Sequence, residues 1–108
     1  MKRILYSTKR LTEADGSIAP FNVEYYILET QTNSANINLS TYGIEIVKTQ
    51  SNDGIECIET KTMPEICACE KEIYEIAKTL CDNIVTPICF EEIIYDITNA
   101  KVCKSSIA

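Results

Sequence analysis

The sequence contains six cysteines and no histidine. The cysteines are therefore the first candidates for metal binding or catalysis. Only one pair is closely spaced, Cys67-Ala68-Cys69. A structural zinc site usually needs two such pairs, or cysteine together with histidine. Metal binding or thiol-redox chemistry at Cys67 and Cys69 is therefore an alternative function. The simpler interpretation is that the cysteines are small hydrophobic side chains in a reducing compartment.

Enzyme chemistry has little support in the sequence. Without histidine, the commonest general base and the usual triads are missing. A thiolate at Cys67 or Cys69 would lie among acidic neighbours, which disfavour it. The three glycines are isolated and form no phosphate-binding loop. We therefore predict a protein with no catalytic residues, no cofactor and no enzyme activity. An enzyme acting on a small substrate is the third and weakest hypothesis.

An acidic cluster, Glu91, Glu92 and Asp96, falls on one predicted helix. Glu92 and Asp96 are four residues apart and share a face, which is an unfavourable arrangement of like charges. Binding of a cationic partner or a divalent ion to these three residues is a hypothesis. The simpler interpretation is a solvated helix face.

The charge distribution narrows the range of partners. The net charge is −6, and the first twelve residues contain four basic residues and no acid. The rest of the chain is therefore strongly acidic and repels phosphate backbones, so we predict no nucleic-acid partner. Basic residues interrupt any signal-peptide core near the start, and no apolar run approaches the roughly 20 residues of a membrane span. We predict a cytoplasmic protein that does not contact membranes.

The elements that position these residues change from strands to helices along the chain. Strands are predicted over about 2–62, and helices over about 69–83 and 87–99, within a single domain spanning 1–108. This segregation favours an α+β fold, a four-stranded antiparallel sheet of two hairpins followed by two C-terminal helices packed on one face.

The first hairpin can be predicted in register. A two-residue turn at the Asp15-Gly16 dipeptide pairs residues whose numbers sum to 31. Ile4 then lies opposite Ile27, and Tyr6 lies opposite Tyr25, with their side chains toward the helices.

The same register defines a candidate interaction surface. Because side chains alternate along a strand, Leu5, Tyr26 and Leu28 point away from the helices. Neighbouring apolar residues on an exposed face usually mark an interaction site. We therefore predict a protein-interaction or regulatory module that binds a protein partner or forms a homodimer through these residues.

The second half of the sheet is less well specified. Residues 31–41 are polar and rich in asparagine, which indicates a surface loop. Ile37 and Leu39 alternate with Asn36 and Asn38, so they could also extend the strand that follows. A turn at Asp53-Gly54 would put Lys48 opposite Glu59, but the apolar residues match poorly and the register stays open. Gly43, inside a strand pattern, indicates a bulge or a close approach of backbone.

The two helices have clear patterns. The first carries a continuous apolar stripe formed by Ile73, Ile76, Ala77, Leu80 and Ile84. The second begins at Thr86-Pro87, because threonine is a good N-cap and proline is favoured at the first helical position. Phe90 begins its buried stripe.

Two segments together resemble a known family. They are Tyr42-Gly43-Ile44-Glu45-Ile46 and the stretch from Val85 to Asp96 that opens with Val-Thr-Pro. They resemble an uncharacterised family of short proteins from anaerobic Gram-positive bacteria, known only as a domain of unknown function, over residues 21–97. The resemblance implies a bacterial cytoplasmic protein in a setting where thiols survive. It implies no activity.

Overall fold

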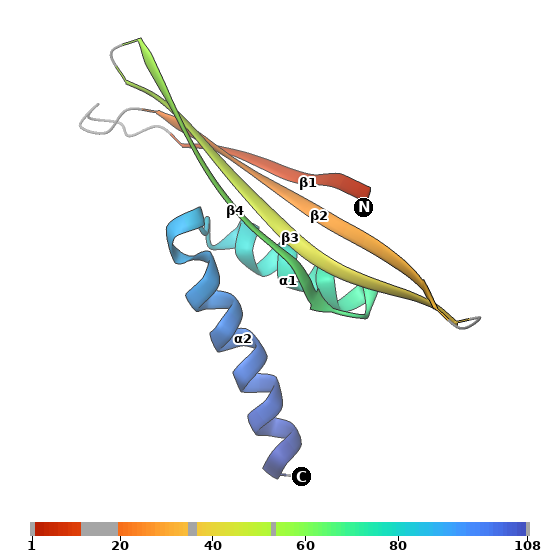
Figure 1. Ribbon diagram of the computed structural model, residues 1–108. Coiled ribbons are helices and arrows are strands. Elements are labelled where there is room, and N and C mark those ends of the chain that lie inside the picture. Colours follow the sequence, from red (N-terminus) through yellow and green to blue (C-terminus); the bar gives the residue numbers. More distant parts are fainter. Residues whose placement is uncertain (1, 12–19, 35–36, 53, 108) are drawn as a thin grey trace.

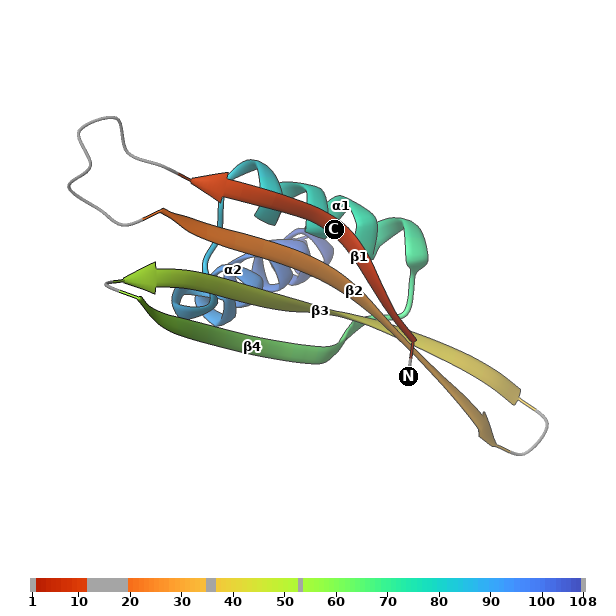
Figure 2. The ribbon, with the colours of Figure 1, turned by 90° about the horizontal axis from the view of Figure 1, so that it is seen from above.

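A computed structural model describes residues 2–11, 20–34, 37–52 and 54–107. The predicted turn at Asp15-Gly16 lies outside these residues. The elements in chain order are β1 (Lys2–Leu11), β2 (Phe21–Ser34), β3 (Ile37–Asn52), β4 (Ile55–Cys67), α1 (Glu70–Asp82) and α2 (Pro87–Ile107). The strands form one antiparallel sheet in the order β1-β2-β3-β4, and both helices lie on the same side of it (Figure 2). The predicted α+β architecture is confirmed.

The first hairpin keeps the predicted register over only half its length. Ile4 lies opposite Ile27 as predicted, but a bulge at Tyr6 shifts the pairing by one residue, so that Ser7 lies opposite Tyr25. The predicted pairing of Tyr6 with Tyr25 is wrong. A bulge inserts one unpaired residue and leaves the alternation on either side intact, which is why Tyr6 still packs against the core.

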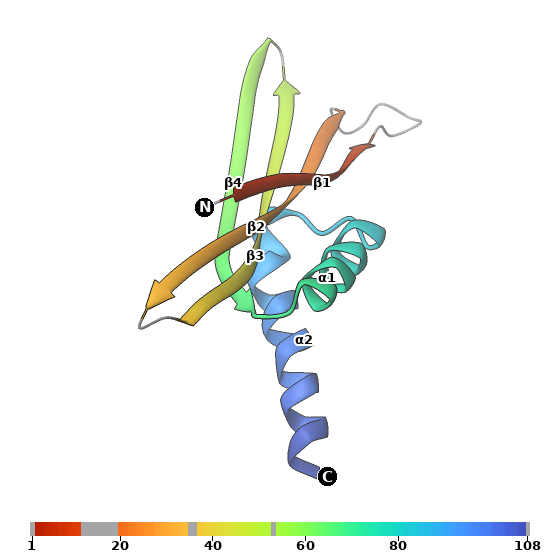
Figure 3. The same ribbon diagram turned by 90° about the vertical axis from the view of Figure 1, so that its right-hand side faces the viewer.

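The predicted loop at 31–41 is wrong, because β2 and β3 continue through most of it. The alternative, that Ile37 and Leu39 extend the following strand, is confirmed. Ser34 pairs with Ile37 and Thr32 pairs with Leu39, so the two strands form a ribbon that extends past the helices (Figures 1 and 3). Leu39 is 58% exposed. Asparagine and other polar residues are depleted in strands, which is why the composition of this segment indicates a loop.

The second hairpin has the register left open by the sequence. Lys48 lies opposite Glu59, and the pairing continues regularly from Asn52 and Ile55 to Ile44 and Met63. Every residue of β4 from Ile55 to Thr60 is exposed. The apolar residues matched poorly because this end of the hairpin extends beyond the helices (Figure 1).

Gly43 occupies the place where β4 bends. The pairing of β3 with β4 shifts between Tyr42 and Ile44. A Cβ atom on Gly43 would overlap the carbonyl oxygen of Met63 and the carbonyl group of Pro64. Both alternatives suggested for this glycine are therefore present, since the register irregularity brings the β4 backbone directly over it.

The core lies between the helices and the sheet. Helix α1 packs across all four strands, and α2 packs against β3 and β4. In this core the sheet contributes Val23, Tyr25, Ile27, Tyr42, Ile44 and Ile46, and the helices contribute Ile73, Ile76, Ala77, Leu80, Cys81, Phe90 and Ile94. The predicted buried faces of both helices are confirmed, except that Ile84 lies past the end of α1. Helix α2 runs to Ile107 rather than to about residue 99.

The corner between the helices closes α1 with a Schellman motif. The amide of Val85 donates to the Leu80 carbonyl at 3.0 Å, and that of Ile84 donates to the Cys81 carbonyl at 3.1 Å. This motif places its C′ residue in the left-handed region, where glycine is usual. Here that residue is Ile84, with φ of 51°, so the corner is strained by a β-branched side chain.

Relief of this strain should be measurable by comparing two variants. Ile84→Gly and Ile84→Ala remove nearly the same apolar surface, but only glycine adopts the left-handed conformation without penalty. We expect Ile84→Gly to be more stable than Ile84→Ala by about 1 kcal/mol, as measured by urea denaturation. Equal stabilities would show that the corner is not strained.

Tyr25 ties this corner to the centre of the sheet. Its side chain is fully buried, and its hydroxyl donates to the Val85 carbonyl at 2.9 Å. Burial, together with the neighbouring Cys81 thiol, raises the pKa of Tyr25. The hydroxyl therefore remains protonated and keeps its role as donor across the physiological pH range.

Tyr25→Phe tests this bond. The variant keeps the ring but leaves the buried Val85 carbonyl without its donor, so we expect a loss of about 1–3 kcal/mol in unfolding free energy. Tyr95→Phe removes a hydroxyl from a residue that is 65% exposed and should change the stability by less than about 0.5 kcal/mol. Equal effects would contradict the role of Tyr25.

Candidate interaction surfaces

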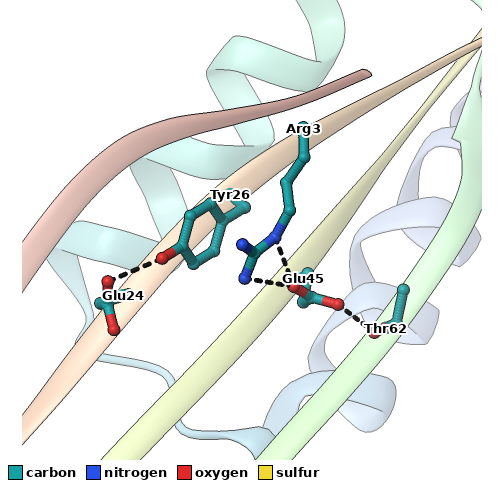
Figure 4. Close-up of polar contacts among 5 residues, drawn as sticks. All are labelled: Arg3, Glu24, Tyr26, Glu45 and Thr62. Atoms are coloured by element: carbon teal, nitrogen blue, oxygen red, sulfur yellow. Dashed lines mark hydrogen bonds and ion pairs between the residues drawn. The ribbon is translucent and has the colours of Figure 1, made fainter. Parts of the chain in front are cut away.

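The sheet face away from the helices carries a polar network (Figure 4). The Arg3 guanidinium donates to Glu45 Oε1 at 2.7 Å, and the Thr62 hydroxyl donates to Glu45 Oε2 at 2.7 Å. The same guanidinium lies over the Tyr26 ring, with its Cζ 3.5 Å from the centroid. The Tyr26 hydroxyl donates to Glu24 at 2.7 Å, and this hydrogen bond is the main reason that the pKa of Tyr26 is raised. The network joins all four strands.

This network changes the surface predicted from Leu5, Tyr26 and Leu28. Leu5 lies directly opposite Tyr26 and is 53% exposed. Tyr26 is half-buried beneath Arg3. Leu28 is only 1% exposed, so the expectation that it is available to a partner is wrong. Leu28 lies opposite Gly43, where the Met63–Pro64 backbone of β4 passes over the same face.

The predicted acidic cluster lies on the solvent side of α2. Its three carboxylates line a shallow hollow of about 550 Å³ with two exposed apolar side chains; we call this set the acidic stripe, formed by Ile88, Glu91, Glu92, Tyr95 and Asp96. Glu91 also forms an ion pair with Lys61 of β4, with 3.2 Å between Glu91 Oε2 and Lys61 Nζ. Among the described residues, no group of three or more acidic or cysteine side chains is placed to hold a metal ion.

The outer edge of β4 was not predicted as an interaction surface. We define the β4 edge as residues Ile55–Met63, which pair with β3 on one side and form the end of the sheet on the other. Ile55 is 67% exposed and Ile58 is 60% exposed. Their odd spacing puts them on opposite faces, so neither face has the continuous apolar pattern of a buried strand. The lack of apolar alternation in this segment is the sequence feature that could have indicated an exposed strand.

The other sheet edge, β1, is different. It contains the bulge at Tyr6 and a concentration of basic side chains. Tyr6 packs edge-on against Tyr74 of α1, with ring centroids 6.0 Å apart. The two tyrosines line a hollow of about 610 Å³ with charged residues of α1. Bulges and lysines are common devices that prevent a strand edge from pairing.

The candidate cysteines meet at the junction of β4 and α1. Cys67 ends β4, and Cys69 is the N-cap residue of α1 without a capping bond from its side chain. The Cys67 thiol donates to the Cys69 carbonyl at 3.4 Å. Five of the six cysteines are free thiols: Cys57, Cys67, Cys69, Cys81 and Cys89. This arrangement brings the predicted pair close together but adds no further metal ligand within the described residues.

No helix in the described part of the chain is both long enough and apolar enough to span a bilayer. A family model described as a family of unknown function (DUF6514) matches residues 1–100. Comparison with curated proteins and with solved structures found no match. The predicted resemblance to a family of unknown function is confirmed, and the match extends beyond the segments on which it rested.

Proposed function

The chain belongs to this family of unknown function, DUF6514, and we propose that it is a small cytoplasmic protein-interaction or regulatory module without catalytic activity. The observation that carries the proposal is the β4 edge. Six consecutive residues, Ile55–Thr60, are exposed on both faces of the sheet. An unpaired strand edge offers a row of backbone donors and acceptors to another strand, and strand addition is a common mode of protein recognition.

The shape of the molecule supports the proposal. Its radius of gyration is 16.3 Å, whereas a compact domain of this length is expected to have about 13 Å. The excess comes from elements that extend beyond the core, namely both ends of the sheet and the C-terminal half of α2 (Figures 1 and 3). Such extensions provide surface for contact with a partner.

Metal binding or thiol-redox activity at Cys67 and Cys69 is the alternative. Cys69 is exposed and Cys67 is partly buried, so both thiols are accessible to a reagent. Metal analysis and thiol titration of protein purified under anaerobic conditions test it. A stoichiometric metal that is lost in the Cys67→Ser, Cys69→Ser double variant would replace the interaction proposal.

The interaction proposal is tested by affinity purification from the host with matched variants. Ile58→Lys changes the β4 edge, whereas Ile88→Lys places the same side chain on α2, where Ile88 is 75% exposed. We expect the set of specifically bound proteins, including tag-free copies of this chain, to be lost with Ile58→Lys and retained with Ile88→Lys. Identical results for both variants and the wild type would contradict an interaction through β4.

A further inference from the structure

We propose that the occupant of the β4 edge is the β4 edge of a second copy of this chain, paired antiparallel about a twofold axis at Thr60. The proposal rests on the interaction function above and names the partner. The two four-stranded sheets would then form one continuous sheet. A twofold interface of this kind uses the same surface on both subunits.

The choice of edge follows from the contrast between the two ends of the sheet. The register of β1 is interrupted by the bulge at Tyr6, and basic residues would repel those of a second β1. Along the β4 edge the pairing with β3 is regular from Ile55 to Met63. The one proline of β4, Pro64, comes only after this segment. The β4 edge is therefore long enough and regular enough to accept another strand.

The symmetry restricts the register. A twofold axis perpendicular to the sheet keeps the helices of both copies on one side, so each residue must pair with a residue that faces the same side. Side chains alternate along a strand, so paired residues face the same side only if an even number separates them in the sequence. The axis must therefore pass beside one residue, which pairs with its own copy, and not between two residues. An axis at Glu59 would place Glu59 opposite itself, and an axis at Lys61 would place Lys61 opposite itself. Both registers put like charges in direct opposition.

An axis at Thr60 makes the edge complementary to itself. Glu59 of each copy then lies opposite Lys61 of the other, which gives two ion pairs about the axis. On the same face, Cys57 lies opposite Met63. On the other face, Ile58 lies opposite Thr62, which covers a side chain that is 60% exposed in the single chain.

The position of Lys61 is consistent with this pairing. Its backbone lies opposite Ile46, on the helix side of the sheet, and its ammonium is already 3.2 Å from Glu91. The side chain of Lys61 remains 43% exposed, so the ammonium can reach a second carboxylate. In the dimer it would lie between Glu91 of its own chain and Glu59 of the second copy, and association should weaken as salt concentration rises.

Charge-reversal variants test the register as well as the dimer. We expect the wild type to associate below about 100 μM, in the range of weak interfaces, in sedimentation equilibrium at low salt. Lys61→Glu and Glu59→Lys should each raise the dissociation constant by about tenfold or more, because each replaces two ion pairs with two repulsive pairs. The Glu59→Lys, Lys61→Glu double variant restores both pairs and should associate like the wild type.

Two further arms complete the test. An equimolar mixture of the two single variants should form a heterodimer, since every Glu59–Lys61 position then carries opposite charges. Glu56→Lys is the matched control, because Glu56 would lie opposite Pro64 and should have little effect. Circular dichroism verifies that each variant is folded. A monomeric wild type, or a dimer indifferent to the single reversals, overturns the proposal. In either case, loss of other bound proteins with Ile58→Lys would still support the interaction function.

Discussion

Replacing Phe90 with alanine should lower the free energy of unfolding by about 3–5 kcal/mol, which is the usual effect of removing a buried aromatic ring. Phe90 has no exposed surface and belongs to the core cluster formed by both helices and the sheet. It lies in the first turn of α2, close to the corner at Val85. Its loss should therefore leave a cavity where the two helices and the sheet meet.

Urea denaturation monitored by circular dichroism measures this effect. If Phe90→Ala is unfolded without denaturant, Phe90→Leu keeps most of the volume and should show a smaller loss in the same direction. Tyr95→Ala is the control on the same helix, because Tyr95 is 65% exposed and exposed substitutions usually change stability by less than about 0.5 kcal/mol. A stability of Phe90→Ala close to that of the wild type would show that α2 does not pack on the sheet as described.

Replacing Gly43 with alanine should lower the free energy of unfolding nearly as much as Phe90→Ala. The cause is overpacking, whereas Phe90→Ala leaves a cavity. The added methyl would overlap backbone atoms of Met63 and Pro64. A flexible side chain can move away from such a contact, but a paired strand can do so only by breaking its pairing. We expect a loss of about 3 kcal/mol or more, at the upper end of the effects of overpacking, measured by the same denaturation experiment.

Gly54 provides the control for conformational effects. Its φ is 81°, and a Cβ added there would meet no atom within 4 Å. Gly54→Ala should therefore lose only the conformational contribution, on the order of 1 kcal/mol. If the two glycine variants have equal stabilities, the close approach of β4 to Gly43 is not a feature of the protein.

The helices and the pairing of Ile4 with Ile27 could be predicted because burial leaves a periodic pattern. The apolar stripe of α1 has one side chain in every turn facing the sheet, and the aromatic and β-branched residues of β2 alternate strictly. The bulge at Tyr6 could not be predicted, since one extra residue changes the register without changing the composition of either strand. The full lengths of β2 and β3 were not predicted, because the segments where they meet are rich in asparagine and other polar residues that are depleted in strands.

The candidate surface was predicted only in part for a related reason. Alternation correctly assigned Leu28 to the face away from the helices, but it could not show that β4 bends over Gly43 beside it. The extension of α2 to Ile107 was also missed, because residues past the sheet lack an apolar stripe. Exposure of the β4 edge is a property of how far the helices reach, which local sequence does not encode.

The order of the strands in the sheet, which follows their order in the chain, has a consequence for how the protein folds. Each strand finds its partner across a single connection, and both helices pack on strands that precede them. Strand pairs that follow the chain order are local in sequence, and local contacts are associated with fast folding. During synthesis the first hairpin can form before the helices emerge from the ribosome. We expect refolding within about milliseconds to tens of milliseconds, rather than the seconds typical of β-sandwiches.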